Sequence, residues 1–130
     1  MIALDTNVLV RYLAQDDREQ AKAATRFIEE ALTAGDPGFI STIVLCEIIW
    51  VLDSCYDLKR TDLVSIVKAL LDTRQIVIGE ANAVRAALNH SSVDLVDAII
   101  HEVGRTRQCQ RTVTFDRKFA RLAGVELLGR

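Results

Sequence analysis

Four acidic residues of this chain share one feature: each stands within, or directly after, a run of apolar residues. They are Asp5, Glu47, Asp97 and Asp116. An unpaired ionised carboxylate is costly away from water, so acids that lie against a core are usually paired, protonated or bound to a cation. If the fold brings the four together, a divalent metal ion is their natural counter-charge.

The other metal-binding residue types favour an oxygen-liganded metal over zinc. His90 and His101 are the only histidines and form no zinc-binding motif, and no two cysteines form a C-x-x-C pair. Carboxylate oxygens suit Mg²⁺ or Mn²⁺. Such an ion can activate water and neutralise charge on a phosphate, so these acids predict metal-assisted hydrolysis of a phosphodiester.

The elements that would position the acids alternate between strand and helix. Apolar runs predict strands at residues 2–5, 39–40, 75–78, 112–114 and 125–128, with amphipathic helices between them. This order predicts an α/β fold with a parallel sheet and helices on both of its faces. Ligands of such sheets bind at the carboxyl ends of the strands, where we place all four acids.

Two helix starts bear on the position of the acids. Ser41 or Thr42 can cap the helix that contains Glu47. Ser91, with Asp94 three residues later, has the spacing of a capping box and predicts the start of the helix that contains the third acid. Both helices should therefore present an acid within their first two turns.

Basic residues collect at the C-terminal end, although the formal net charge is only −2. Residues 1–104 carry 9 basic and 16 acidic groups, whereas residues 105–130 carry 7 basic and 2 acidic groups. A polyanion bound by Arg107, Arg117 and Lys118 would lie close to the fourth acid. Taken alone, a solvated basic surface is the simpler interpretation.

Composition bounds the class of protein. A chain of 130 residues with 50% hydrophobic content fits a single domain over residues 1–130 with a core of its own. We expect the three cysteines to be buried and reduced, and Trp50 and the other aromatic residues to lie in the core rather than to stack on bases. Because no apolar run reaches the ~20 residues of a membrane-spanning helix and no basic leader follows Met1, we expect a cytoplasmic protein with no membrane partner.

Four sequence blocks carry a family resemblance. Leu4–Val8, Glu47, Val96–Ile100 and Thr114–Phe119 follow one another in the order and spacing of PIN-domain ribonucleases, and the whole chain resembles VapC-type toxins of toxin–antitoxin pairs. The resemblance implies a three-layer α/β/α fold with a central, mainly parallel sheet of about five strands. It also implies Mg²⁺- or Mn²⁺-dependent endoribonuclease activity, a homodimer, and inhibition by a cognate antitoxin.

The resemblance also assigns roles to individual residues. Asp5 and Asp97 would be the firmest metal ligands, Glu47 would bind metal directly or through water and help to activate the nucleophile, and Asp116 would complete the site. The residues that support these acids in similar proteins correspond here to Thr6, Asn7 and Thr114. The basic residues expected to face RNA are Arg107, Arg117 and Lys118.

Two residues near Asp97 have open roles. Asp94 lies one turn before it and would be able to join the metal shell, but a place in a helix cap explains Asp94 without a ligand, and we favour the cap. His101 stands one turn beyond Asp97, where similar sequences usually have a small residue. Its ring either approaches the site or merely covers it, and we favour the second role.

Two other classes of function compete with the nuclease hypothesis. A receiver-like module would use Asp5 in a non-enzymatic acidic pocket, but it would need an acceptor Asp after the third strand, where Gly79 follows Ile78. An inactive PIN protein would bind other proteins only, and the complete set of four acids argues against it. The sequence also lacks the phosphate-binding loop of nucleotide-binding proteins and the nucleophile elbow of serine hydrolases.

Overall fold

The computed structural model describes residues 1–129. Its contacts divide the chain into two compact units, an N-terminal unit of Met1–Gly79 and a C-terminal unit that begins at Glu80. Each unit contains helices and parallel strands, which confirms the predicted α/β class. A single domain over residues 1–130 stays a prediction.

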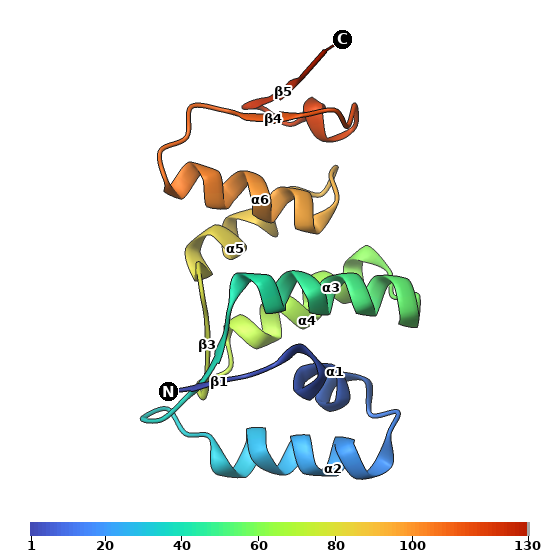
Figure 1. The fold of residues 1–130 in the computed structure, drawn as a ribbon, viewed down its shortest axis with the longest axis vertical. Helices are drawn as coiled ribbons and strands as arrows, with labels where there is room; N and C mark the ends of the chain where they lie inside the picture. Colours follow the sequence, from blue (N-terminus) through green and yellow to red (C-terminus); the bar gives the residue numbers. More distant parts are fainter. Residues whose placement is uncertain (130) are drawn as a thin grey trace. The chain divides into compact units, whose positions relative to one another are not determined.

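The N-terminal unit is built on a three-stranded parallel sheet in the order β1-β2-β3 (Figure 1). The strands are β1 (Ile2–Ala3), β2 (Gly38–Ile40) and β3 (Ile76–Ile78). Gly38 begins the central strand, where an added Cβ would stand 2.7 Å from Cδ1 of Leu4 and 2.8 Å from Cδ1 of Leu32. Close packing of these two leucines therefore favours a glycine at this position.

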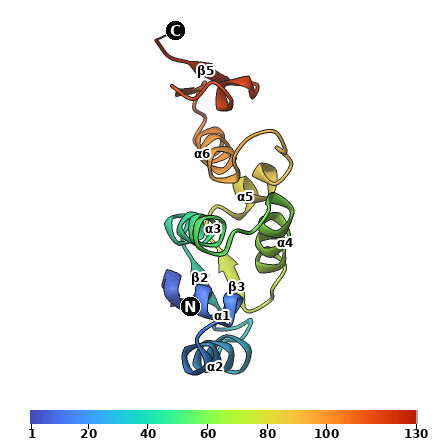
Figure 2. The same ribbon diagram turned by 90° about the vertical axis from the view of Figure 1, so that its right-hand side faces the viewer.

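Helices surround this sheet (Figure 2). They are α1 (Thr6–Ala14), α2 (Arg18–Arg26), which continues as a π-helical turn η1 (Phe27–Ala31), α3 (Thr42–Tyr56) and α4 (Arg60–Leu71). Helix α1 packs against both α2 and α3, and α4 packs against β3. Apolar side chains of the helices and of β2 form the core of the unit, and those with 0–1% exposure include Leu9, Ile28, Ile40, Leu45, Ile48 and Val67.

Strand β1 differs from the buried strand expected at residues 2–5. It ends at Ala3, and both of its residues are exposed, whereas Leu4 is buried. The reason is that β1 is an edge strand of its sheet and pairs only with β2. Asp5 consequently stands outside the strand, at the N-cap of α1.

The C-terminal unit contains two helices and a pair of parallel strands. Its elements are α5 (Ala81–Ala87), α6 (Leu95–Thr106), β4 (Thr112–Thr114), a 3₁₀ turn η2 (Phe119–Arg121) and β5 (Val125–Leu127). All five predicted strands thus form and all are parallel, but they pair as a sheet of three and a sheet of two. The N–H of Thr112 and the carbonyl of Thr114 form hydrogen bonds with Gly124 and Leu128, which flank β5. The hydrogen-bond partners of these two β4 groups therefore come from the same unit.

The start of α6 corrects one sequence expectation. The helix begins at Leu95, and its N-cap is Asp94, whose carboxylate accepts a hydrogen bond from the N–H of Asp97 at 3.4 Å. The capping box predicted at Ser91 is therefore wrong by three residues, because Asp94 supplies the oxygen that the first turn needs. Asp94 is still a cap, as expected, although it is the capping residue rather than the third residue of a box.

The structure bears on two expectations drawn from composition, one about the cysteines and one about membrane-spanning helices. No disulfide joins the cysteines within residues 1–129, but Cys55 and Cys109 are exposed, so the expectation that all three are buried is wrong. Cys55 lies in the last turn of α3 and Cys109 follows α6, where the chain is at the surface. In the same described range, no helix is both long enough and apolar enough to cross a membrane.

The N-cap of α3 yields a first prediction, because this helix carries Glu47. Ser41 caps it, as one of the two expected residues, and its hydroxyl accepts the N–H of Val44 at 3.3 Å. Ser41→Ala should lower the free energy of unfolding by about 1 kcal/mol, since it leaves that N–H without its partner. Urea denaturation followed by circular dichroism measures the change. Ser65→Ala, on the exposed side of α4, is the matched control, and equal stability of the two variants would contradict the cap.

Candidate functional site

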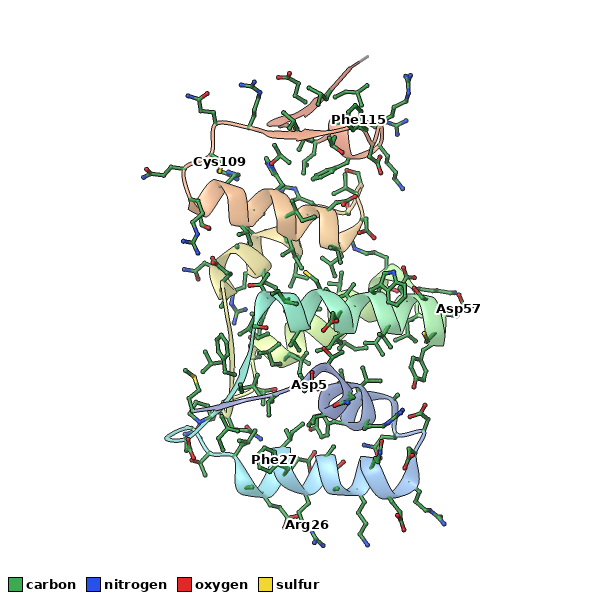
Figure 3. All side chains as sticks on the ribbon, in the orientation of Figure 1. Asp5, Arg26, Phe27, Asp57, Cys109 and Phe115 are labelled. Carbon is green, nitrogen blue, oxygen red and sulfur yellow. The ribbon has the colours of Figure 1, made fainter. Side chains whose placement is uncertain are left out.

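Thr6 connects the first two predicted acids. The side chain of Asp5 caps α1, and its Oδ1 accepts the N–H of Thr6 at 2.8 Å. The hydroxyl of Thr6 donates to Oε1 of Glu47 at 2.6 Å. Figure 3 shows Asp5 between the end of β1 and the start of α1. Asp5 and Glu47 thus accept hydrogen bonds from the same threonine, which lies where the resemblance places a supporting residue.

These residues lie at a surface hollow of about 380 Å³ in the N-terminal unit. Asp5, Thr6, Asn7, Glu47 and Arg11 are among the residues that line it. Sequence reasoning missed Arg11, which lies four residues after Asn7 on α1 and therefore faces the same side of the helix. Its guanidinium bonds to Gln20 at 2.7 Å and to Asp16 at 3.3 Å, so it is held by groups other than the predicted acids.

The other two predicted acids form a second group in the C-terminal unit. Partial burial raises the pKa of the Asp97 carboxyl above its ordinary value, and the negative charges of Asp94 and Asp116 raise it further. Asp97 stands in the first turn of α6, and Asp116 follows β4. Asp97 is therefore near both Asp94 and Asp116 in the C-terminal unit.

Backbone hydrogen bonds hold Asp116 in place. Its Oδ1 accepts the N–H groups of Lys118 at 2.8 Å and of Phe119 at 3.0 Å. The N–H of Asp116 in turn donates to the hydroxyl of Thr114 at 3.0 Å. The side chain of Thr114, which was predicted as a supporting residue, therefore contacts the main chain of Asp116.

His101 joins α6 to the strand pair. The ring is 4% exposed, and its Nδ1 lies 2.7 Å from the hydroxyl of Thr112 on β4. Gly124, before β5, packs so closely that an added Cβ would stand 3.1 Å from Cε1 of the ring. The buried ring thus serves as a contact between elements, and its role towards the acidic site stays a prediction. Sequence reasoning did not find its partner Thr112.

The predicted quartet thus falls into two groups, one in each unit. None of the four acids forms an ion pair with a lysine, arginine or histidine within residues 1–129. Across the same residues, no three histidine, cysteine or acidic side chains are grouped closely enough to hold a metal ion as they stand. The donor atoms of both groups are carboxylate oxygens, the type that Mg²⁺ and Mn²⁺ prefer.

The basic residues expected to face RNA differ in their surroundings. Arg107 is exposed but pairs with Glu80 at 2.8 Å. Arg117 and Lys118 are exposed next to Asp116 and form no ion pair in the described part of the chain. Arg117 and Lys118 are therefore the freer candidates for binding phosphates.

Comparisons with known proteins identify the family. The PIN domain matches residues 2–125, nearly the whole chain and both units, so the chain belongs to the PIN domain family. The chain is similar to a VapC ribonuclease of Aquifex aeolicus (strain VF5), with 24% identity over 125 residues that cover 94% of this chain and 92% of the relative. No solved structure matches the chain. The family resemblance expected from the four sequence blocks is confirmed.

The raised pKa of Asp97 yields a prediction for stability against pH. A raised pKa means that the folded protein binds this proton more tightly than the unfolded chain does, so ionised Asp97 destabilises the fold at neutral pH. Without metal, Asp97→Asn should raise the free energy of unfolding at pH 7 by no more than about 1 kcal/mol, because partial exposure screens the repulsion. The gain should shrink as the pH falls towards the ordinary Asp value of 3.8.

Urea denaturation in EDTA at a series of pH values measures this gain. Asp53→Asn, an exposed acid on α3, is the control and should change stability little at any pH. An Asp97→Asn variant that is no more stable than the natural protein at pH 7 would show that the repulsion is negligible.

The contact between His101 and Thr112 yields a third prediction. Thr112→Val keeps the shape of the side chain but leaves a buried ring nitrogen without its partner, so it should lower the free energy of unfolding by about 1–3 kcal/mol. Thermal or urea denaturation measures the loss. Thr61→Val on the exposed side of α4 is the matched control, and an equal effect of the two substitutions would contradict the role given to Thr112.

Proposed function

We propose that the protein is an Mg²⁺- or Mn²⁺-dependent endoribonuclease that hydrolyses RNA phosphodiester bonds, with Asp5, Glu47, Asp97 and Asp116 as its catalytic, metal-binding residues. The observation that carries the proposal is geometric: N–H and O–H groups hold the carboxylates of Asp5, Glu47 and Asp116, and none of the four acids forms an ion pair within residues 1–129. The chain belongs to the PIN domain family, and the resemblance of its four sequence blocks assigns these acids to the motif positions of PIN-domain ribonucleases.

The hydrogen bonds of three of these acids support a metal-binding role. Asp5, Glu47 and Asp116 each have one carboxylate oxygen engaged by a backbone N–H or by the hydroxyl of Thr6. Within residues 1–129, the second oxygen of each accepts no hydrogen bond from the protein. One oxygen thus orients the side chain, and the other is left for a ligand.

The chemistry needs both the acids and a cation. When bound, Mg²⁺ or Mn²⁺ would make an attacking water easier to deprotonate and would neutralise charge on the scissile phosphate. Glu47, oriented by the Thr6 hydroxyl, would accept a proton from that water, and Asp5 and Asp97 would be the firmest ligands. The exposed side chains of Arg117 and Lys118 would bind the phosphates on either side.

We further propose that the protein is the toxin component of a type II toxin–antitoxin system. The support is the similarity to a protein named VapC ribonuclease. On this proposal the protein acts in the cytoplasm, forms a homodimer, and binds a cognate antitoxin that inhibits cleavage. A small neighbouring open reading frame with a DNA-binding amino terminus would support the antitoxin, and sedimentation of the purified protein would test the dimer.

A cleavage assay tests the proposed activity. Protein purified free of any antitoxin should cut RNA in Mg²⁺ or Mn²⁺, and EDTA should abolish the cutting. Asp5→Asn, Asp97→Asn and Glu47→Gln should each slow cleavage by about 100-fold or more, because a metal site contributes several kcal/mol to the transition state.

Asp53→Asn is the matched control for Glu47→Gln, because both acids are exposed on α3, and it should keep full activity. Cleavage that survives both EDTA and Asp5→Asn would overturn the proposed site. If the protein bound its partners but cut no RNA under any condition, an inactive PIN protein that acts only by binding would be the better description.

A further inference from the structure

Phe115 is an aromatic side chain that the proposed mechanism does not use. It lies between Thr114, the last residue of β4, and Asp116, and it is 76% exposed. Figure 3 shows its side chain on the loop that follows β4. Single exposed apolar residues are common on protein surfaces, so it is the position of this ring beside a proposed catalytic acid that suggests a role for it.

The loop around Phe115 is well fixed, so the exposure does not come from a lack of local contacts. Thr114 and Asp116 are joined by a hydrogen bond of 3.0 Å, and Oδ1 of Asp116 accepts two further backbone N–H groups. Phe119, four residues after Phe115, is buried at 5% exposure. This segment therefore buries Phe119 in the unit and leaves Phe115 exposed.

The ring is also supported on one side. Gly129 passes beside it, and an added Cβ on that glycine would stand 3.3 Å from Cε1 of Phe115. Backbone contact on one side, with most of the ring exposed, leaves an aromatic surface open to a flat partner. Such a surface suits a nucleobase, because every base has a face that can stack on an aromatic ring.

The charges around Phe115 indicate which class of partner this surface fits. Arg117 and Lys118 follow Asp116 directly, both are exposed, and neither forms an ion pair in the part of the chain described by the structure. An aromatic ring flanked by free cations is the combination that binds single-stranded nucleic acid, since the cations bind phosphates while the ring stacks on a base. An apolar protein partner would gain nothing from the cations.

We propose that Phe115 is a stacking site for an unpaired base of the RNA substrate, next to the phosphate that is cut, with Arg117 and Lys118 binding the adjoining phosphates. This inference rests on the proposed function and narrows it, because a base can stack on Phe115 only where it is not paired in a duplex.

Binding in EDTA tests the site separately from cleavage. Fluorescence anisotropy measures the affinity for a short single-stranded RNA of mixed sequence and for the same RNA annealed to its complement. Phe115→Leu keeps an apolar side chain but removes the ring, and it should weaken binding of the single strand by about 5- to 30-fold while changing duplex binding little. Phe115→Tyr should keep the affinity for the single strand.

Matched variants separate stacking from charge. Trp50 is 65% exposed on α3, so Trp50→Leu removes another exposed ring and should leave RNA affinity unchanged. Arg117→Gln should reduce the slope of log affinity against log salt by about 0.7, whereas Phe115→Leu should keep the slope. In a Trp50→Phe background, the fluorescence of Phe115→Trp should be quenched by the single strand and not by the duplex.

Each result bears on one proposal. Equal binding of the single strand by the natural protein and Phe115→Leu, or no binding by the natural protein, would overturn the stacking site even if cleavage were intact. Loss of affinity for a protein partner with RNA affinity unchanged would also overturn it. Conversely, selective binding of single strands through Phe115 by a protein that cuts no RNA would keep the stacking site and overturn the nuclease proposal.

Discussion

Repulsion between Asp97 and its neighbours Asp94 and Asp116 raises the pKa of the Asp97 carboxyl beyond the effect of its partial burial. The fold has to hold these three like charges near one another without help from a basic side chain. Hydrogen bonds hold the elements in place: Asp94 caps α6, Asp116 accepts two backbone N–H groups, and His101 bonds from α6 to β4. Neutral donors can orient a carboxylate without cancelling its charge, which leaves the negative potential available to a cation.

The same use of neutral donors appears in the N-terminal unit, where Thr6 serves both Asp5 and Glu47. Several of the arginines are paired with other acids: Arg11 with Asp16, Arg105 with Glu102, Arg107 with Glu80 and Arg111 with Glu126. Three of these pairs, those of Asp16, Glu80 and Glu126, lie at or near the surface, where each contributes little to stability, whereas Glu102 is buried. The four proposed metal-binding acids, in contrast, form no ion pair within residues 1–129.

Much of the secondary structure could be predicted from the sequence, because apolar periodicity and cap residues are local signals, as Ser41 before α3 illustrates. Strand pairing could not, because it depends on which backbone groups meet, and the five strands divide into three and two. The acids could be named from their motifs, but their partners Thr112 and Arg11 carry no local signal. Strand β4 departs most clearly from the expected pattern of burial. Its threonines are half-buried and Val113 is exposed, the reverse of the usual pattern. Phe115 after this strand and Trp50 on α3 are also exposed, so the expectation that they lie in the core is wrong.

The contact made by His101 has a consequence for how this family can vary. The ring fills space against Gly124 and bonds to Thr112, so one side chain on α6 constrains a residue on β4 and another in the turn before β5. A smaller residue at position 101 would leave the Thr112 hydroxyl without this partner and leave room beside Gly124. Sequence changes at these three positions are therefore expected to be correlated during evolution, and a histidine at the first should occur together with a hydroxyl or another hydrogen-bonding group at the second.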